Sequence, residues 1–370
     1  MMFLGIVFLK DKLRAGIKEA VSEVTSAGIQ TVILTGDSRE TAVAIATECG
    51  IFREKSGHIA LTSEELSRLR DDELSEILPL VRVVARALPT DKTRLVRISQ
   101  EKNLVVGMTG DGINDAPSLK LADVGFAMGS GTDIAKAAGD VVILDDSFSA
   151  ISKTVLYGRT IFKSIRKFIT FQLIMNLAAC GVSILGQFIG IESPITIMQM
   201  LWINVIMDTL GGLAFAGEAP LSYYMKEKPK RRDEPILSFG MLGQIAFLGG
   251  YTLLLCCLFL GLDVFGEIFG AAYGNVRFLT AFYALFVFLG LFNCFLARSE
   301  RLYIFSNIGK NKPFIFIMLL IFTVQLVMIY FGGSLFRTVP ISPRDIWICL
   351  LLSSTTVLFE LARRVFIRLK

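Results

Sequence analysis

Residues 109–118 read Thr-Gly-Asp-Gly-Ile-Asn-Asp-Ala-Pro-Ser, which places Asp111, Asn114 and Asp115 in one tight turn. The apolar run 104–108 comes directly before this turn and is predicted to be a buried strand. In an α/β sheet, ligands bind beyond the carboxyl ends of the strands. Two carboxylates and an amide on such an exit loop are typical of a site for Mg²⁺ and a phosphoryl group.

Strand and helix patterns alternate on either side of this turn, from the start of the chain to about residue 150. A helical pattern over 39–49 stops at Gly50, and a second helix opens at residues 89–92. This alternation predicts a mostly parallel sheet with helices on both faces. The predicted strands are 31–34, 81–85, 104–108, 124–127 and 141–144.

Three loops are predicted to leave the same edge of this sheet, carrying Thr35-Gly36-Asp37, then Lys92, then the turn 111–115. A hydroxyl and backbone N–H groups hold phosphoryl oxygens, an ammonium neutralises developing charge, and a carboxylate holds Mg²⁺. Each loop taken alone has the composition of an ordinary capped turn. The three together in this order favour a phosphate site.

The amino-acid composition of the second half of the chain is typical of a membrane protein. Overall, 53% of residues are hydrophobic and the mean hydropathy is +0.60. Basic residues cluster beside the apolar segments at 163–167, 226–232, 298–312 and 363–370, so the net charge of +5 does not indicate nucleic-acid binding. Six segments are long enough to span a bilayer: 168–189, 195–216, 241–262, 278–296, 314–331 and 346–366.

The distribution of basic residues predicts the orientation of these spans. The loops on the other side carry only Arg277, Arg337 and Arg344, so both termini are predicted to be cytoplasmic. Helical pattern also continues without Pro from about residue 149 into the first span. If it is unbroken to residue 189, that helix is roughly 60 Å long. An ordinary juxtamembrane helix is the alternative.

Cysteine and histidine content excludes some kinds of site. The six cysteines show no Cys-x-x-Cys spacing, and we interpret them as reduced, packed thiols. His58 is the only histidine, which excludes catalysis or metal binding by histidine clusters.

Polar residues inside the predicted spans are few, and polar groups in a bilayer are commonly functional. Asp208 has no basic residue in its own span, Asn204 lies four residues earlier, and Asn176 lies in the preceding span. Their oxygens suit a hard cation such as Ca²⁺. For the two asparagines, interhelical hydrogen bonding is the alternative.

Three stretches, 33–37, 89–92 and 108–119, resemble the phosphorylation domain of P-type cation-transporting ATPases, which has a haloacid-dehalogenase-like fold. The resemblance implies that Asp111 binds Mg²⁺ and that Lys92 holds the phosphoryl group transferred from ATP. It also implies that Thr35, Gly36, Asp37, Asn114 and Asp115 complete the phosphate site, with Asp115 behind the Mg²⁺ ligands. Asp11 and Arg14 match the hinge that returns from the family's nucleotide-binding domain.

One expected motif is missing. The family's phosphate acceptor is the aspartate of Asp-Lys-Thr-Gly-Thr, which does not occur in these 370 residues. The resemblance therefore maps to the carboxyl-terminal portion of a pump, and we expect no ATP hydrolysis by this chain alone. The actuator domain, the nucleotide-binding domain and the first four membrane helices are expected on a missing amino-terminal half.

The membrane spans carry the same resemblance. Residues 199–209 resemble the sixth membrane helix of plasma-membrane-type Ca²⁺ pumps and their bacterial relatives, and 171–176 resemble the fifth. Pumps that carry two Ca²⁺ have additional acids where this chain has Ala179 and Gly290, which implies one Ca²⁺ per cycle. The family completes its site with a glutamate and carbonyls of the fourth helix.

These observations predict a partial phosphorylation domain over 1–147, a stalk helix over 148–167 and six membrane helices, family helices 5 to 10, over 168–370. The predicted function is that of the carboxyl-terminal part of an ATP-driven Ca²⁺ pump in the plasma membrane. Its expected partners are the lipid bilayer, the transported cation and the missing amino-terminal half of the pump. The alternatives are a non-catalytic membrane subunit, regulator or relic, a membrane-anchored phosphatase, or a pump for Mn²⁺ or another cation.

Overall fold

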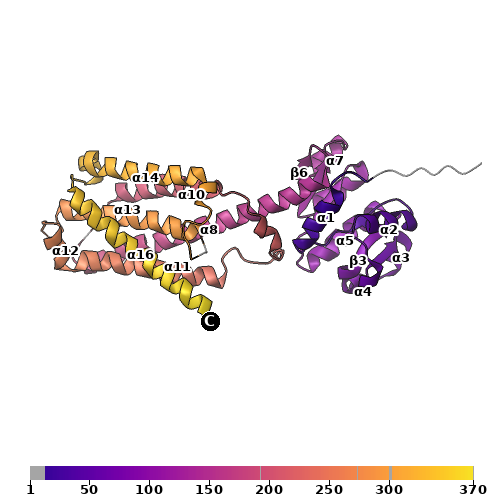
Figure 1. The fold of residues 1–370 in the computed structure, drawn as a ribbon, viewed down its shortest axis with the longest axis horizontal. Helices are drawn as coiled ribbons and strands as arrows, with labels where there is room; N and C mark the ends of the chain where they lie inside the picture. Colours follow the sequence, from indigo (N-terminus) through magenta and orange to yellow (C-terminus); the bar gives the residue numbers. More distant parts are fainter. Residues whose placement is uncertain (1–12, 192, 273, 300–301, 370) are drawn as a thin grey trace, which may run out of the picture. The chain divides into compact units, whose positions relative to one another are not determined.

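A computed structural model describes residues 13–191, 193–272, 274–299 and 302–369 (Figure 1). The chain forms two compact units, Met1–Arg159 with Pro220–Glu234, and Thr160–Ala219 with Pro235–Lys370. The domain boundaries at residues 147 and 167 stay predictions. Asp11, Arg301 and Lys370 lie outside the described residues.

The first unit contains two three-stranded parallel sheets, in the orders β1-β3-β2 and β4-β5-β6. The strands are short, apolar and mostly buried, as expected of parallel strands covered by helices. The fold class is confirmed, but the predicted single sheet is divided in the described residues. The strands are β1 (Ile33–Leu34), β2 (Ile59–Thr62), β3 (Val81–Ala85), β4 (Gly107–Gly110), β5 (Val124–Met128) and β6 (Val141–Ile143).

The two sheets meet at β1 and β4. Within the described ranges, β1 pairs only with β3 and β4 pairs only with β5, so each is an edge strand. Leu34 of β1 packs against the apolar cluster that contains Met108 of β4. Gly107 and Thr109 of β4 are exposed, although β4 was predicted to be buried. These two edges carry the loops that contain Thr35 and Asp111.

The strand prediction needs two corrections. The strand predicted at 104–108 begins three residues later, and Leu104 and Val105 are 47% and 53% exposed, so apolar character here did not indicate burial. The prediction also missed β2, which is only four residues long and follows His58 without a strong apolar run.

The helices of this unit begin and end at recognisable caps. The Ser38 side chain accepts the Thr41 N–H at the start of α2, and Gly50, with φ of 82°, follows its end as predicted. The helices are α1 (Ile17–Ser26), α2 (Arg39–Glu48), α3 (Ser63–Arg68), α4 (Asp71–Ile77), α5 (Pro89–Glu101), α6 (Ala116–Leu121) and α7 (Asp133–Ala138).

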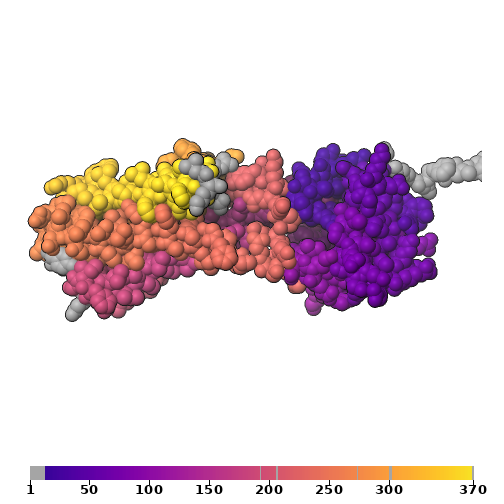
Figure 2. Space-filling view, turned by 90° about the horizontal axis from the view of Figure 1, so that it is seen from below, coloured from indigo at the N-terminus to yellow at the C-terminus, as the bar shows by residue number. Residues whose placement is uncertain are grey.

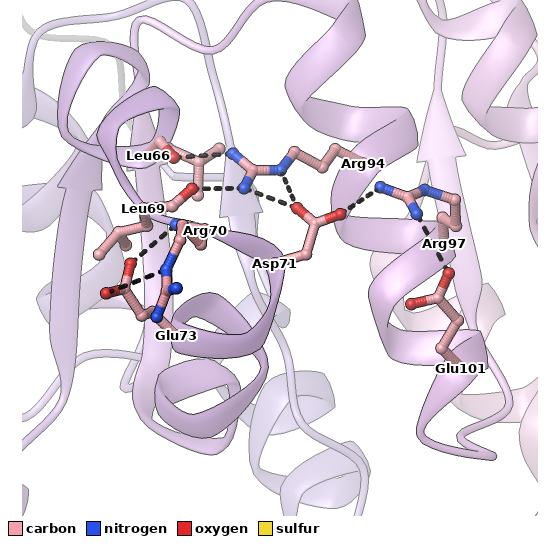
Figure 3. A network of polar contacts seen from close by, with 8 residues as sticks. All are labelled: Leu66, Leu69, Arg70, Asp71, Glu73, Arg94, Arg97 and Glu101. Carbon is pink, nitrogen blue, oxygen red and sulfur yellow. Dashed lines mark hydrogen bonds and ion pairs between the residues drawn. The ribbon is translucent and has the colours of Figure 1, made fainter.

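Helix α5, which carries Lys92, is held by a network of polar contacts (Figure 3). Asp71 of α4 accepts from Arg94 and Arg97 of α5 at 2.8 and 2.7 Å. Arg94 also donates to the carbonyls of Leu66 and Leu69 at 2.8 and 2.6 Å. The network fixes α5 against α3 and α4.

The segment 220–234 packs on this unit as well. The Arg159 guanidinium donates to the carbonyls of Ala27, Tyr224 and Glu227, each at 2.8 Å. Arg232 forms an ion pair with Asp123 at 2.9 Å. Some basic residues interpreted as membrane flanks therefore have protein partners.

The second unit is helical, and the six predicted spans are confirmed as six helices of sufficient length and hydropathy. The helix that continues from residue 149 into the first span is also confirmed, since α8 runs unbroken over Phe148–Phe188. The helices are α8, α9 (Ile197–Trp202), a π-helical segment (Ile203–Asp208), α10 (Thr209–Ala216), α11 (Phe239–Gly261), α12 (Asp263–Ile268), α13 (Val276–Arg298), α14 (Lys312–Phe331), α15 (Gly333–Phe336) and α16 (Pro343–Leu369).

Helix α13 forms the centre of this unit. Its apolar window is 89% buried, whereas the corresponding windows of the other five spans are 28–39% buried. Helix α16, yellow in Figure 2, lies on the outside of the unit. The remaining exposed apolar faces are consistent with contact with lipid or with further helices.

Candidate functional site

The first candidate site lies where β3 and β4 deliver their exit loops. Lys92, in the first turn of α5, places its Nζ 2.5 Å from Oδ1 of Asp115. Both side chains are largely buried, at 16% and 9% exposure. The structure thus brings together two of the residues that the sequence predicted to act together.

Asp115 is fixed from the other side by the backbone. Its Oδ2 accepts the N–H groups of Asp111 and Gly112, each at 3.2 Å. Burial alone would raise the pKa of Asp115, but the hydrogen bonds from Lys92 and Gly112 and the Lys92 charge together lower it. A Cβ at Gly110 would overlap the Asp115 side chain, so only glycine fits there.

The first loop is tied to the second. The Thr35 hydroxyl donates to Oδ2 of Asp37 at 2.9 Å, and the Thr35 carbonyl accepts the Ala87 N–H at 2.9 Å. This pairing continues the β1–β3 ladder past Ala85 and positions the start of α5. Gly36 and Asp37 are exposed.

Asp111 and Asn114 are exposed at the carboxyl end of β4. The Asp111 carbonyl accepts the Thr132 N–H at 2.8 Å, and a Cβ at Gly131 would lie 2.9 Å from that carbonyl oxygen. The segment 131–132 therefore packs closely against the Asp111 loop and holds it in place. An exposed carboxylate beside the charged pair fits Mg²⁺, a hard cation that keeps several waters. Arg14, predicted to lie at the hinge, donates to the Asp146 carbonyl at 2.6 Å.

The second candidate site lies in the second unit. Asn176 of α8 and Asn204 and Asp208 of the π-helical segment line one small cavity, and apolar side chains, Ala179 among them, complete its wall. Asn176 and Asn204 are exposed, so the cavity opens to the surface of this unit. The cavity offers oxygen ligands from two helices, and no cysteine or histidine lines it among the described residues.

The π-helical segment is a departure from the predicted regular helix over 195–216. It occupies Ile203–Asp208 between α9 and α10 and contains both predicted ligands of this span. A π-helical turn widens the hydrogen-bond register, and such turns are common at functional sites. Apolar periodicity does not reveal the residue that such a turn inserts, so this segment could not be predicted from the sequence.

Gln172 was not among the predicted site residues. Its Nε2 donates to Oδ2 of Asp208 at 2.9 Å, from α8 to the end of the π-helical segment. An amide four residues before Asn176 within an apolar span was the available signal.

Gly290 occupies one of the two positions at which the resemblance places an additional acidic residue in pumps that carry two Ca²⁺. A Cβ there would overlap the methyl carbon of Met207 and lie 3.2 Å from that of Met175. Both methionines are buried, so thioether groups fill the place that an acidic side chain would need. The number of cations that the site holds stays a prediction.

A buried ionic cluster near the ends of the spans was not anticipated. Glu218 lies 2.9 Å from Arg298 and 3.3 Å from Lys167, and Asn311 donates to it at 3.3 Å. Arg298 and Glu218 are only 2% and 7% exposed. Lys167, interpreted from the sequence as a membrane flank, is thus paired within the protein.

Family models match both parts of the chain. Residues 192–366 match the family described as "Cation transporting ATPase, C-terminus". Residues 2–123 and 94–155 match families described as "haloacid dehalogenase-like hydrolase".

Similar curated proteins are calcium-transporting ATPases. "Plasma membrane calcium-transporting ATPase 3" of Rattus norvegicus is 38% identical over 94% of this chain and 29% of its own length. "Calcium-transporting ATPase 9, plasma membrane-type" of Arabidopsis thaliana is 37% identical over 92% of this chain and 32% of its own length. The chain spans about a third of the length of these relatives. It belongs to the P-type cation-transporting ATPase family and matches the carboxyl-terminal part of these members.

Proposed function

We propose that this chain is the carboxyl-terminal part of an ATP-driven Ca²⁺ pump. The observation that carries the proposal is the cavity lined by Asn176, Asn204 and Asp208, where an acidic group and two amides meet within membrane-spanning helices. Oxygen ligands suit Ca²⁺, the transported substrate. The names of similar proteins also favour Ca²⁺ over Mn²⁺.

In this proposal the Lys92–Asp115 pair serves the phosphoryl group. Asp115, whose pKa is lowered, holds the Lys92 ammonium at a fixed place, from which it faces the phosphoryl oxygens. The Gly36 N–H binds a further oxygen, and the Thr35 hydroxyl binds another once its proton turns from Asp37 to the phosphoryl group. Asp111, with Asp115 behind it, would hold Mg²⁺, which neutralises charge on the phosphoryl group when bound.

The phosphate acceptor and the nucleotide-binding domain are proposed to come from an amino-terminal part of the pump. The edge strands β1 and β4 support this proposal, because both have unpaired edges among the described residues and both carry the motif loops. A strand added beside them would place its carboxyl end next to Lys92 and Asp111. The 370-residue chain alone is then inactive toward ATP.

We further propose a multi-pass location in the plasma membrane with both termini on the side of the nucleotide. The basic loops flanking the spans support this orientation. Cysteine labelling from each side of sealed vesicles tests it.

Radioactive Ca²⁺ uptake into vesicles tests the main proposal. The chain is joined to the amino-terminal part of a similar Ca²⁺-transporting ATPase, and ATP-dependent uptake is measured with Ca²⁺ and with Mn²⁺. Uptake of Ca²⁺ at lower concentration than Mn²⁺ is expected. Uptake of neither ion would refute the function, and phosphoenzyme formed from ATP by the isolated chain would refute the need for a second part.

A further inference from the structure

Gln172 and Asp208 form a polar contact within the second unit, between a residue that lines the cavity and one that does not. Gln172 Nε2 donates to Oδ2 of Asp208 at 2.9 Å, and both side chains are partly buried. Asp208 lines the cavity, whereas Gln172 is not among its lining residues in the described chain. Gln172 therefore contacts the carboxylate from outside the cavity.

From this arrangement we infer that Gln172 is a positioning residue for the cation site, an inference that rests on the proposed function. Its amide holds one oxygen of the Asp208 carboxylate and leaves the other to bind the cation. Ligating carboxylates in metal sites are commonly oriented by such hydrogen bonds, which are strengthened by the charge of the acceptor.

The place of Asp208 explains why an orienting partner is needed. Asp208 is the last residue of the π-helical segment, where the regular α-helical register is interrupted. Gln172 lies on α8, an unbroken helix, one turn before the cavity-lining Asn176. The contact therefore sets the Asp208 carboxylate in a fixed relation to the second predicted ligand.

The chemical nature of the partner also favours positioning. Among the described residues, no lysine or arginine forms an ion pair with Asp208, and Gln172 supplies the hydrogen bond to its side chain. A basic partner would neutralise the carboxylate and compete with the cation. A neutral amide orients the carboxylate and leaves its charge available.

The competing explanation is that the bond only joins α8 to the neighbouring span. An interhelical hydrogen bond of that kind would contribute only to the stability of the folded protein. A purely structural bond would affect folding and maximal rate, whereas a positioning bond affects the cation concentration that activates the pump.

The test uses a Gln172→Met variant of the complete pump, since methionine has a similar length but no N–H donor. The Ca²⁺ concentration for half-maximal uptake should rise about tenfold or more. Maximal uptake at saturating Ca²⁺ and phosphorylation from inorganic phosphate should stay unchanged. Gln187→Met is the matched control, because Gln187 is an exposed residue of the same helix.

A second variant keeps the inference testable if Gln172→Met does not fold. Gln172→Asn keeps the amide but is one methylene too short to reach, and it should show the same shift. An unshifted Ca²⁺ dependence in a folded variant, or a fall in maximal rate alone, would overturn the inference. Absence of uptake by the unaltered pump would instead refute the proposed function, which separates the two failures.

Discussion

Gly290→Ala probes how tightly the core is filled beside the cavity that Asn176, Asn204 and Asp208 line. The added methyl would overlap the Met207 methyl carbon and lie 3.2 Å from that of Met175, and both methionines are at most 4% exposed. Both thioether side chains must then move within a packed core, which costs about 1–3 kcal/mol. Alanine also gains about 1 kcal/mol of helix propensity over glycine.

Gly250→Ala on α11 isolates the packing effect, since a Cβ at Gly250 would meet nothing within 4 Å. Both variants gain the helix propensity, so Gly290→Ala should be about 1–3 kcal/mol less stable than Gly250→Ala. Denaturant titration of the detergent-solubilised chain, followed by circular dichroism, measures the free energies of unfolding. Equal stability of the two variants would refute the packing argument.

A double-mutant cycle locates the effect. Met207→Ala alone leaves a cavity, and the methyl group that Gly290→Ala introduces then has room to enter it. The two substitutions together should therefore be less destabilising than the sum of the single ones, by about 0.5 kcal/mol or more. Strict additivity would place the clash elsewhere.

The remaining predictions concern the two polar clusters and the phosphate site. The pKa of Asp115 is lowered from its ordinary value of 3.8, so this carboxylate stabilises the fold above pH 3.8 and that stabilisation is lost as the pH falls further. When the free energy of unfolding is measured against pH, Lys92→Met should therefore lose less stability in acid than the unaltered chain. Glu218→Gln should lower the free energy of unfolding by about 3–5 kcal/mol, because it leaves Arg298 buried without its carboxylate partner. Glu267→Gln, at an exposed residue, is the control, and a loss below about 1 kcal/mol for Glu218→Gln would contradict the prediction. In a complete pump, Asp111→Asn should impair Mg²⁺-dependent phosphorylation from both ATP and inorganic phosphate, and normal labelling by either route would exclude its role as the Mg²⁺ ligand.

Local patterns were enough to predict much of the first unit. The strand 81–85 has the predicted bounds, and α2 ends before Gly50, because apolar runs and caps act within a few residues. Leu104 and Val105 misled the prediction, since exposure depends on which neighbours cover a strand. The division of the sheet between β1 and β4 likewise depends on pairing partners distant in sequence.

The cavity lined by Asn176, Asn204 and Asp208 shows a similar limit. Asn176, Asn204 and Asp208 stood out because polar groups are rare in apolar spans, and the structure brings them to one cavity. The π-helical segment and the contact from Gln172 depend on local register and on the packing of α8 beside this span. Neither leaves a periodic signal, so only the three-dimensional structure reveals them.

The central claim is that the Asp208 carboxylate binds the transported cation. Asp208→Asn in the complete pump tests this most directly, because the substitution removes the charge and preserves the shape. We predict that Ca²⁺-dependent phosphorylation from ATP is abolished while phosphorylation from inorganic phosphate remains. Unchanged activation by Ca²⁺ in this variant would contradict the account.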